Sequence, residues 1–166
     1  PFDCAILLGH GGFPADWNRV KLFDEWLVPV CAPDVLGSTR WTAAQLAAAE
    51  LIHPSRDCRD WRRWLQRVGL IDAVAWQRGK LFDTLELGIS AAAQGHGVSI
   101  GDLALVAAEL HKGALALPFD QAVRSGDSYY LVWPATGETP ESLTRMKDYL
   151  LQHLPDVGNR GVTLLD

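Results

Sequence analysis

The fold of this chain is decided by residues 80–102, KLFDTLELGISAAAQGHGVSIGD, which have the pattern of a strand, a capped helix and a second strand. Leu81 opens a brief apolar run, and Asp83 then stands at an N-cap position with Glu86 three residues later, the spacing of a capping box. Apolar residues follow at helical spacing until Gly95, which favours the left-handed conformation that ends helices. Val98 to Ile100 is the second strand, so we predict a compact β-α-β unit.

The start of the predicted helix is also a candidate ligand contact. Backbone N–H groups at a helix N-terminus have no partner inside the helix, and Thr84 adds a hydroxyl beside them. Such an end can hold a carboxylate or a carbonyl oxygen, and simple capping of the helix is the alternative interpretation.

The same stretch contains the pattern G-x-S-x-G at residues 97–101, which is typical of the nucleophile turn of hydrolases. His10-Gly11-Gly12 upstream has the composition of an oxyanion-hole loop. A nucleophile turn needs a long strand leading into its first glycine, whereas Gly97 follows a predicted helix. Ser99 is therefore expected to lie inside a strand, and a hydrolase that uses Ser99 with Asp120 or Asp127 and His153 stays the least favoured alternative.

Composition indicates one or two small globular domains, because 48% of the 166 residues are hydrophobic. The net charge is −5, and five arginines between residues 56 and 67 alternate with Asp57 and Asp60 on one predicted helix, as in a solvated face. Direct nucleic-acid binding by these residues is not expected. No apolar run of about 18 residues and no signal peptide is present, so these residues are not expected to span a membrane or to be targeted to one, and a leader before Pro1 is the alternative left open.

Cysteine and histidine usage argues against metal sites. The three cysteines are odd in number and lack C-x-x-C spacing, which predicts neither a disulfide framework nor a zinc site and fits a reducing cytoplasm. The histidines lack the helical i, i+4 pairing of metal ligands, so no metal and no cofactor is expected; those considered are His10, His53, His96 and His111. His53, at the end of a predicted strand, is kept as a hydrogen-bonding group for a ligand.

The rest of the chain alternates strands and helices, which indicates an α/β fold. Strands are expected at Phe2–Leu8, 21–32 with an edge or bend at Pro29, 51–53, 114–119 and 123–133; helices are expected at 42–49, 57–68 with Trp61 and Trp64 in the core, 103–110 and from Pro140 after an N-cap at Thr139. The first strand begins so abruptly that further sequence is expected before Pro1. Two long strands predict two crossover connections between two subdomains, with a ligand cleft between them.

The combined segments FDCAILLGHGGFP, LVPVCAP, LIHPSRDCRDWRRWLQRVGL, LFDTLELGISAAAQGHGVSIGDLALVAAEL and LALPFDQAVRSGDSYYLVWP are similar to the effector-binding domain of LysR-type transcriptional regulators. Within that family they resemble the subgroup of the glycine-cleavage activator and the β-lactamase regulator. The resemblance implies a two-lobed fold like type 2 periplasmic binding proteins, with two crossover strands. It implies a first lobe, incomplete here, from residues 1–30 and 120–166, a second lobe from 31–119, and a winged helix-turn-helix before Pro1.

The resemblance also implies the ligand-binding positions, which lie in the cleft between the lobes. They fall on Gly9, His10, His53, Ser55, Asp83, Thr84, Leu85, Gly97, Ser99 and Tyr129. Serine is frequent in this subgroup where the chain has Leu85, so a hydroxyl is lost and a muropeptide ligand is not favoured.

Together these inferences predict a non-enzymatic sensor domain of a cytoplasmic transcription factor. A small-molecule effector would shift the equilibrium between two oligomer arrangements, and DNA would be bound only by the helix-turn-helix outside these residues. A homodimer or tetramer is expected, with the helix at 57–68 or 84–94 near the interface and with Phe2–Leu8 partly uncovered in these 166 residues. A solute-binding protein of the same fold is the main alternative.

Overall fold

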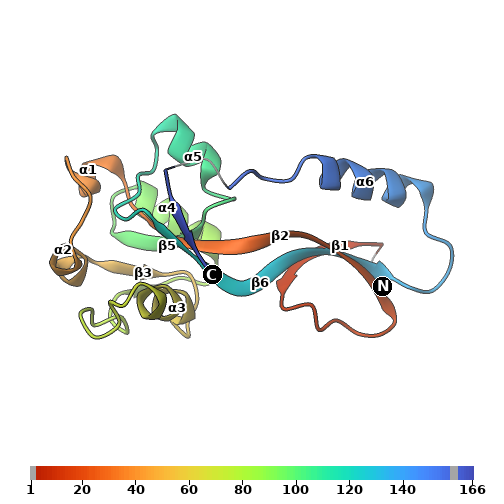
Figure 1. The fold of residues 1–166 in the computed structure, drawn as a ribbon, viewed down its shortest axis with the longest axis horizontal. Coiled ribbons are helices and arrows are strands. Elements are labelled where there is room, and N and C mark those ends of the chain that lie inside the picture. Colours follow the sequence, from red (N-terminus) through yellow and green to blue (C-terminus); the bar gives the residue numbers. More distant parts are fainter. Residues whose placement is uncertain (1–2, 158–160) are drawn as a thin grey trace. The chain divides into compact units, whose positions relative to one another are not determined.

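The computed structural model describes residues 3–157 and 161–166, which form a mixed α/β protein of two compact units (Figure 1). Unit 1 contains Pro1–Glu25 and Gly126–Asp156, and unit 2 contains Trp26–Ser125 and Val157–Asp166. Two 14-residue strands, β2 (Trp17–Val30) and β6 (Gln121–Pro134), run from one unit into the other. The two long crossover strands predicted from the sequence are therefore present.

One sheet holds the described strands in the order β1-β6-β2-β5-β3-β4, with β7 (Thr163–Leu165) paired to β6. In unit 1, β1 (Ala5–Gly9) runs antiparallel to β6, from Ala5 opposite Val132 to Gly9 opposite Ser128. In unit 2, β3 (Leu51–His53) is parallel to both β4 (Lys80–Leu81) and β5 (Val98–Asp102). This parallel part of the sheet carries the predicted β-α-β unit.

Unit 1 has a small core of its own. One cluster of this core has Leu22, Leu131 and Leu143 as its buried members, and Leu143 comes from helix α6 (Glu141–Gln152). On β1, Ile6 and Leu8 are 52% and 41% exposed, so alternate side chains of this edge strand are uncovered. This exposure agrees with the expectation that the strand is partly uncovered, and an antiparallel strand such as β1 needs cover on only one face. Pro1 and Phe2, where that strand was expected to start, lie outside the described residues.

Helices cover both faces of the sheet in unit 2. They are α1 (Pro33–Leu36), α2 (Ala43–Ala48), α3 (Arg59–Arg67), α4 (Leu85–Ala93) and α5 (Ala107–Lys112). On one face, Leu51 packs with Trp61 and Trp64 of α3, both fully buried. On the other face, Ile52 packs with Ala91 and Ala92 of α4. Both tryptophans are thus core residues, as predicted.

Both buried indoles also find hydrogen-bond acceptors. Trp61 Nε1 donates to the carbonyl oxygen of Ile52, and Trp64 Nε1 donates to that of Gln121, each at 2.9 Å. A buried indole needs such a partner because an unpaired N–H in a core is costly. Trp64 therefore ties α3 to the start of β6 as well as filling the core.

Three predicted helix starts need correction. The N-cap of α4 is Thr84 and not Asp83, since Thr84 is extended and its hydroxyl accepts from the N–H of Leu87 at 3.3 Å. Helix α3 begins at Arg59 because Cys58 has left-handed dihedrals, with φ 55°. Helix α6 has Pro140 as N-cap, one residue later than expected. The capping box of Thr42 and Gln45 is confirmed in full, with α2 ending at Ala48.

Three further expectations were wrong. Helix α5 begins at Ala107, not Leu103, because the carboxylate of Asp102 accepts from the N–H of Ala104 at 3.0 Å and holds a turn there. Residues 114–119 form no strand but a single bridge between Ala116 and Cys31, in a segment that Pro118 interrupts. Pro29 lies inside β2, opposite Ile100, and β2 has neighbours on both sides, so the expected edge position was wrong and the alternative of a bend stays a prediction.

The three cysteines are free thiols, and burial raises the pKa of Cys31 to about 11. In the part of the chain that the structure describes, no three or more histidine, cysteine or acidic side chains come together as metal ligands. No described helix has both the length and the apolar surface needed to cross a bilayer.

Candidate functional site

The loops that follow β3 and β4 form the best candidate for a binding site. Because these strands are parallel, both carboxyl ends lie at the same edge of the sheet, where open α/β sheets bind their ligands. Arg56, after β3, and Asp83, after β4, meet there, with Arg56 Nε 2.8 Å from Asp83 Oδ1. This edge therefore presents a cation and an anion side by side, each on a mostly exposed side chain.

The ion pair also sets the charge state of the edge. The hydrogen bond from Arg56 to Asp83, reinforced by the attraction of the carboxylate, raises the pKa of Arg56 above its ordinary value. Arg56 therefore keeps its positive charge, and a ligand carboxylate that binds it must compete with Asp83. Solvent screens an ion pair as exposed as this one, so the pair adds little to the stability of the fold and can open easily.

The N-terminus of α4 lies directly after Asp83. Thr84 caps it, and the next turn carries Leu85, half-buried, and Leu87, which is 52% exposed. Helix dipoles favour negative charge at this end. The helix approaches β5 closely at Gly88, where an added Cβ would lie 3.1 Å from Ser99 Oγ. A glycine at this position lets α4 sit close to the strand, which fixes the place of its N-terminus.

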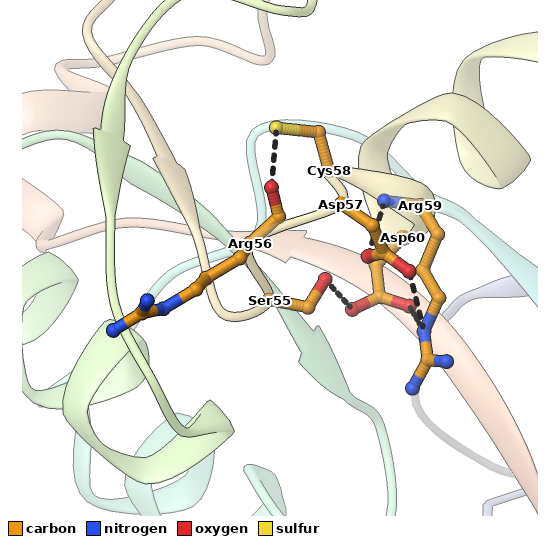
Figure 2. A network of polar contacts seen from close by, with 6 residues as sticks. All are labelled: Ser55, Arg56, Asp57, Cys58, Arg59 and Asp60. Atoms are coloured by element: carbon orange, nitrogen blue, oxygen red, sulfur yellow. Dashed lines mark hydrogen bonds and ion pairs between the residues drawn. The ribbon is translucent and has the colours of Figure 1, made fainter.

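Figure 2 shows the loop between β3 and α3, in which Arg56 points away from Asp57, Arg59 and Asp60. Ser55 Oγ donates to Asp60 Oδ2 at 3.4 Å. Burial raises the pKa of Asp60, while the nearby positive charges of Arg59 and Arg63 oppose the shift. Ser55 is thus engaged with a partly desolvated carboxyl group that belongs to the first turn of α3.

His53 has no exposed surface, and its ring Nε2 lies 2.9 Å from the carbonyl oxygen of Arg78. A carbonyl only accepts, so Nε2 carries the proton and donates. The ring thus binds the protein's own backbone in this structure.

Ser99 is fully buried in β5, and its Oγ donates to the carbonyl oxygen of Ile100 at 3.2 Å. It lies inside the strand, as expected, and under α4 at Gly88. We predict that a fluorophosphonate probe leaves the chain unlabelled, because a nucleophile must reach its substrate. Mass spectrometry of the treated protein would check this; an adduct on wild-type protein that disappears in Ser99→Ala would contradict it.

Gly97 lies at the other end of the parallel strands. It precedes β5, so it is at the amino edge, whereas Asp83 and Thr84 follow the carboxyl end of β4. An added Cβ on Gly97 would lie 2.4 Å from the carbonyl oxygen of Glu50, and its φ is +148°. Close backbone packing therefore accounts for this glycine, and the structure does not bring it to the candidate site.

The remaining predicted ligand positions belong to unit 1. Gly9 ends β1 opposite Ser128, and His10 beyond it is exposed. Tyr129, on β6, stacks on Phe23 with ring centroids 4.6 Å apart. Unit 2 thus brings together Ser55, Asp83, Thr84 and Leu85, the residues that flank the carboxyl edge of β3 and β4.

Sequence reasoning missed two residues of this edge. Arg56 was grouped with the arginines of the α3 face, and Asp60 was grouped with the acidic residues between them. The signal for Arg56 was its position directly after the strand-ending Pro54-Ser55, outside the helix. For Asp60, the only local signal was its place in the first turn of a helix.

Known proteins with similar sequences are regulators of transcription. A family model described as the LysR substrate binding domain matches residues 1–155. The glycine cleavage system transcriptional activator of Escherichia coli strain K12 is 33% identical over 133 residues, which are 78% of this chain and 42% of that protein. The HTH-type transcriptional activator AmpR of Pseudomonas aeruginosa is 29% identical over 150 residues, 90% of this chain and 49% of that protein.

Solved structures agree with these sequence matches. The X-ray structure of the effector domain of AmpR from Pseudomonas aeruginosa superimposes with a TM-score of 0.77 at 28% identity, covering 90% of this chain and 70% of that one. The AmpR effector-binding domain from Citrobacter freundii gives a TM-score of 0.76 at 23% identity. The chain spans about half the length of the curated relatives it matches.

Proposed function

This chain belongs to the LysR substrate-binding domain family, and we propose from that premise that it is the effector-sensing part of a LysR-type transcriptional regulator. Its fold is the two-lobed, type 2 periplasmic-binding-protein-like fold of that family. We propose that unit 1 is the first lobe and unit 2 the second. The boundaries expected from the sequence, 1–30 and 120–166 against 31–119, then move to Pro1–Glu25 with Gly126–Asp156 and Trp26–Ser125 with Val157–Asp166.

The effector contacts in the second lobe are the carboxyl edge of β3 and β4 and the N-terminus of α4. The observation that carries this proposal is the meeting of Arg56 and Asp83 beside the capped end at Thr84. The edge offers donors and an acceptor in a small space, which suits a small polar molecule with a carboxylate or carbonyl oxygen. Leu85 and the exposed Leu87 add apolar contact at the same end of α4.

The mechanism is a population shift. An effector that binds one conformation of the domain better than another moves the equilibrium by its difference in binding free energy. Such a coupling is typically about 1–3 kcal/mol, which is enough to change promoter occupancy several-fold. No chemical step is required, so the proposal assigns the chain no enzymatic activity and no cofactor.

Effector binding should raise thermal stability, because a ligand that binds only the folded state stabilises it. At a concentration about a hundred times its Kd, an effector adds about 2.7 kcal/mol. That gain corresponds to an increase in Tm of about 5–10 °C for a domain of this size. Differential scanning fluorimetry against a panel of amino acids, dicarboxylates, nucleobases and short peptides would identify the compound.

The variant Thr84→Val tests the site. It removes the cap of α4 and the hydroxyl, so it should lower Tm and abolish the shift caused by the compound. The matched control is Thr42→Val, which removes the equivalent cap of α2. We expect the control to lower Tm, since a cap contributes about 1 kcal/mol, and to keep the shift. A panel without any stabilising compound, or a shift that survives in Thr84→Val, would count against the proposal.

The proposed partners are a second copy of the regulator and DNA, the latter bound by a helix-turn-helix domain outside these residues, in the cytoplasm. The 166 residues alone, with net charge −5, are expected not to bind a promoter fragment. A mobility-shift titration at two salt concentrations measures this, because phosphate contacts make DNA binding salt-sensitive. A salt-sensitive complex formed by these residues alone would contradict the expectation, and sedimentation of the same sample gives the oligomeric state.

A further inference from the structure

We infer that His53 is a positioning residue of the proposed effector site: its ring holds the backbone at Arg78 and thereby places Asp83 and Thr84, without touching the effector. That these residues bind an effector rests on the proposed function. That His53 positions them rests on the geometry of β3 and β4.

The ring lies on the face of the sheet opposite α4. Side chains alternate between the two faces along a strand. Ile52 packs with Ala91 and Ala92 of α4, whereas Leu51 packs on the face that α3 covers. His53 shares its face with Leu51 and has no exposed surface. An effector at the N-terminus of α4 is therefore separated from the ring by the sheet itself.

Two hydrogen bonds from His53 bracket β4. Its ring Nε2 lies 2.9 Å from the carbonyl oxygen of Arg78, just before the strand, and its own carbonyl accepts from the N–H of Phe82 at 2.8 Å, just after it. The other ring nitrogen, Nδ1, is buried without a hydrogen-bond partner among the described residues. The bond to Arg78 is therefore the polar contact that orients the imidazole.

Strand β4 depends on such bonds because it buries no side chain. It is two residues long, lies at the end of the sheet order, and both Lys80 and Leu81 are exposed. Its own two side chains therefore add no hydrophobic burial, and Phe82, directly after it, is the nearest side chain packed against the core. The side chain of Arg78 makes a second contact, because its guanidinium donates a hydrogen bond to the carbonyl oxygen of Ala47 in the last turn of α2. The buried ring and α2 together define where β4 begins.

The candidate site follows β4 without a break. Asp83 comes two residues after Leu81, and Thr84 caps α4 next. Release of Arg78 from His53 would free the start of β4 and give Asp83 a wider range of positions. His53, on the face of the sheet opposite α4, thus sets the geometry of the effector site without contacting the effector.

Two variants of equal side-chain length test this role. In His53→Gln the amide nitrogen is as many bonds from the backbone as Nε2 and can donate to Arg78. In His53→Met the same length carries no donor. We expect amide hydrogen exchange of residues 79–84 to rise about threefold to tenfold in His53→Met, the factor for one lost hydrogen bond, and to stay within about twofold of wild type in His53→Gln. Exchange in α6 should not change in either variant.

The exchange measurement needs no effector, so it separates this inference from the proposed function. Equal exchange in all three proteins, or an increase spread over the whole of unit 2 in both variants, would overturn the positioning role. For the compound that stabilises wild type in the fluorimetry panel, we expect affinity to fall about fivefold in His53→Met and to be restored in His53→Gln. If both variants bind the compound like wild type while exchange changes as expected, His53 restrains β4 but does not affect effector binding, and the inference is overturned as well.

Discussion

Trp64→Ala should destabilise unit 2 by about 3–5 kcal/mol, the range for truncating a buried aromatic side chain. Trp64 is fully buried, packs edge-on against Trp61 and Phe119, and ties α3 to β6 through Gln121. The substitution removes the ring, its aromatic contacts and that hydrogen bond at once. Because natural domains are stable by only about 5–15 kcal/mol, the loss is a large share of the total.

Thermal unfolding followed by circular dichroism measures this effect, and we expect a fall in Tm of about 6–20 °C. Trp64→Phe, which keeps an aromatic ring without the N–H, should lose less because most of the contact surface remains. Tyr149→Ala is the surface control, since Tyr149 is 60% exposed and its loss should change stability by less than about 0.5 kcal/mol. A Trp64→Ala protein that unfolds with wild-type Tm would show that α3 does not hold this core together.

Gly97→Ala is expected to cost more than about 3 kcal/mol, because two penalties combine at one position. The backbone has φ +148°, which side chains avoid, and the new Cβ would lie 2.4 Å from the carbonyl oxygen of Glu50. That oxygen accepts from the N–H of Val98 at 2.9 Å, so it cannot move without breaking the entry into β5. Denaturant titration of the folded protein gives the change in free energy of unfolding.

Gly69→Ala is the control for the cost of positive φ without a close contact of the new Cβ. Gly69 has φ +76°, but no atom lies within 4 Å of where its Cβ would be. We expect this control to lose only about 1–2 kcal/mol, the cost of left-handed backbone for a residue with a side chain. Equal losses at the two glycines would mean that the approach of Gly97 to Glu50 contributes nothing.

The local part of this fold could be predicted because its signals lie close together in the sequence. The capping box of Thr42 and Gln45 spans three residues and is confirmed. Gly95, with φ +81°, ends the predicted helix of the β-α-β unit. The cap of α4 was missed by one residue because Asp83 is bound instead by Arg56, 27 positions away. Such a pairing has no local sequence signal.

The candidate site could be predicted only in part, for a geometrical reason. Asp83 and Thr84 were identified because a helix start is visible in the sequence. Gly97 was predicted as a ligand position from the family resemblance, and the structure places it at the opposite end of the parallel strands. Sequence order does not say which residues share one edge of a parallel sheet. His53 was predicted as a hydrogen-bonding group for the ligand. The face on which its side chain lies follows from the packing of Leu51 against α3, and a three-residue strand is too short to reveal that alternation in the sequence.

The exposed, two-residue strand β4 has a consequence for evolution. Lys80 and Leu81 contribute nothing to the core, so mutations there carry little folding penalty and can accumulate. The residues that follow them are those we propose to meet the effector. Substitutions after β4 can therefore change ligand preference at this edge without a compensating change in the buried core around Trp61 and Trp64.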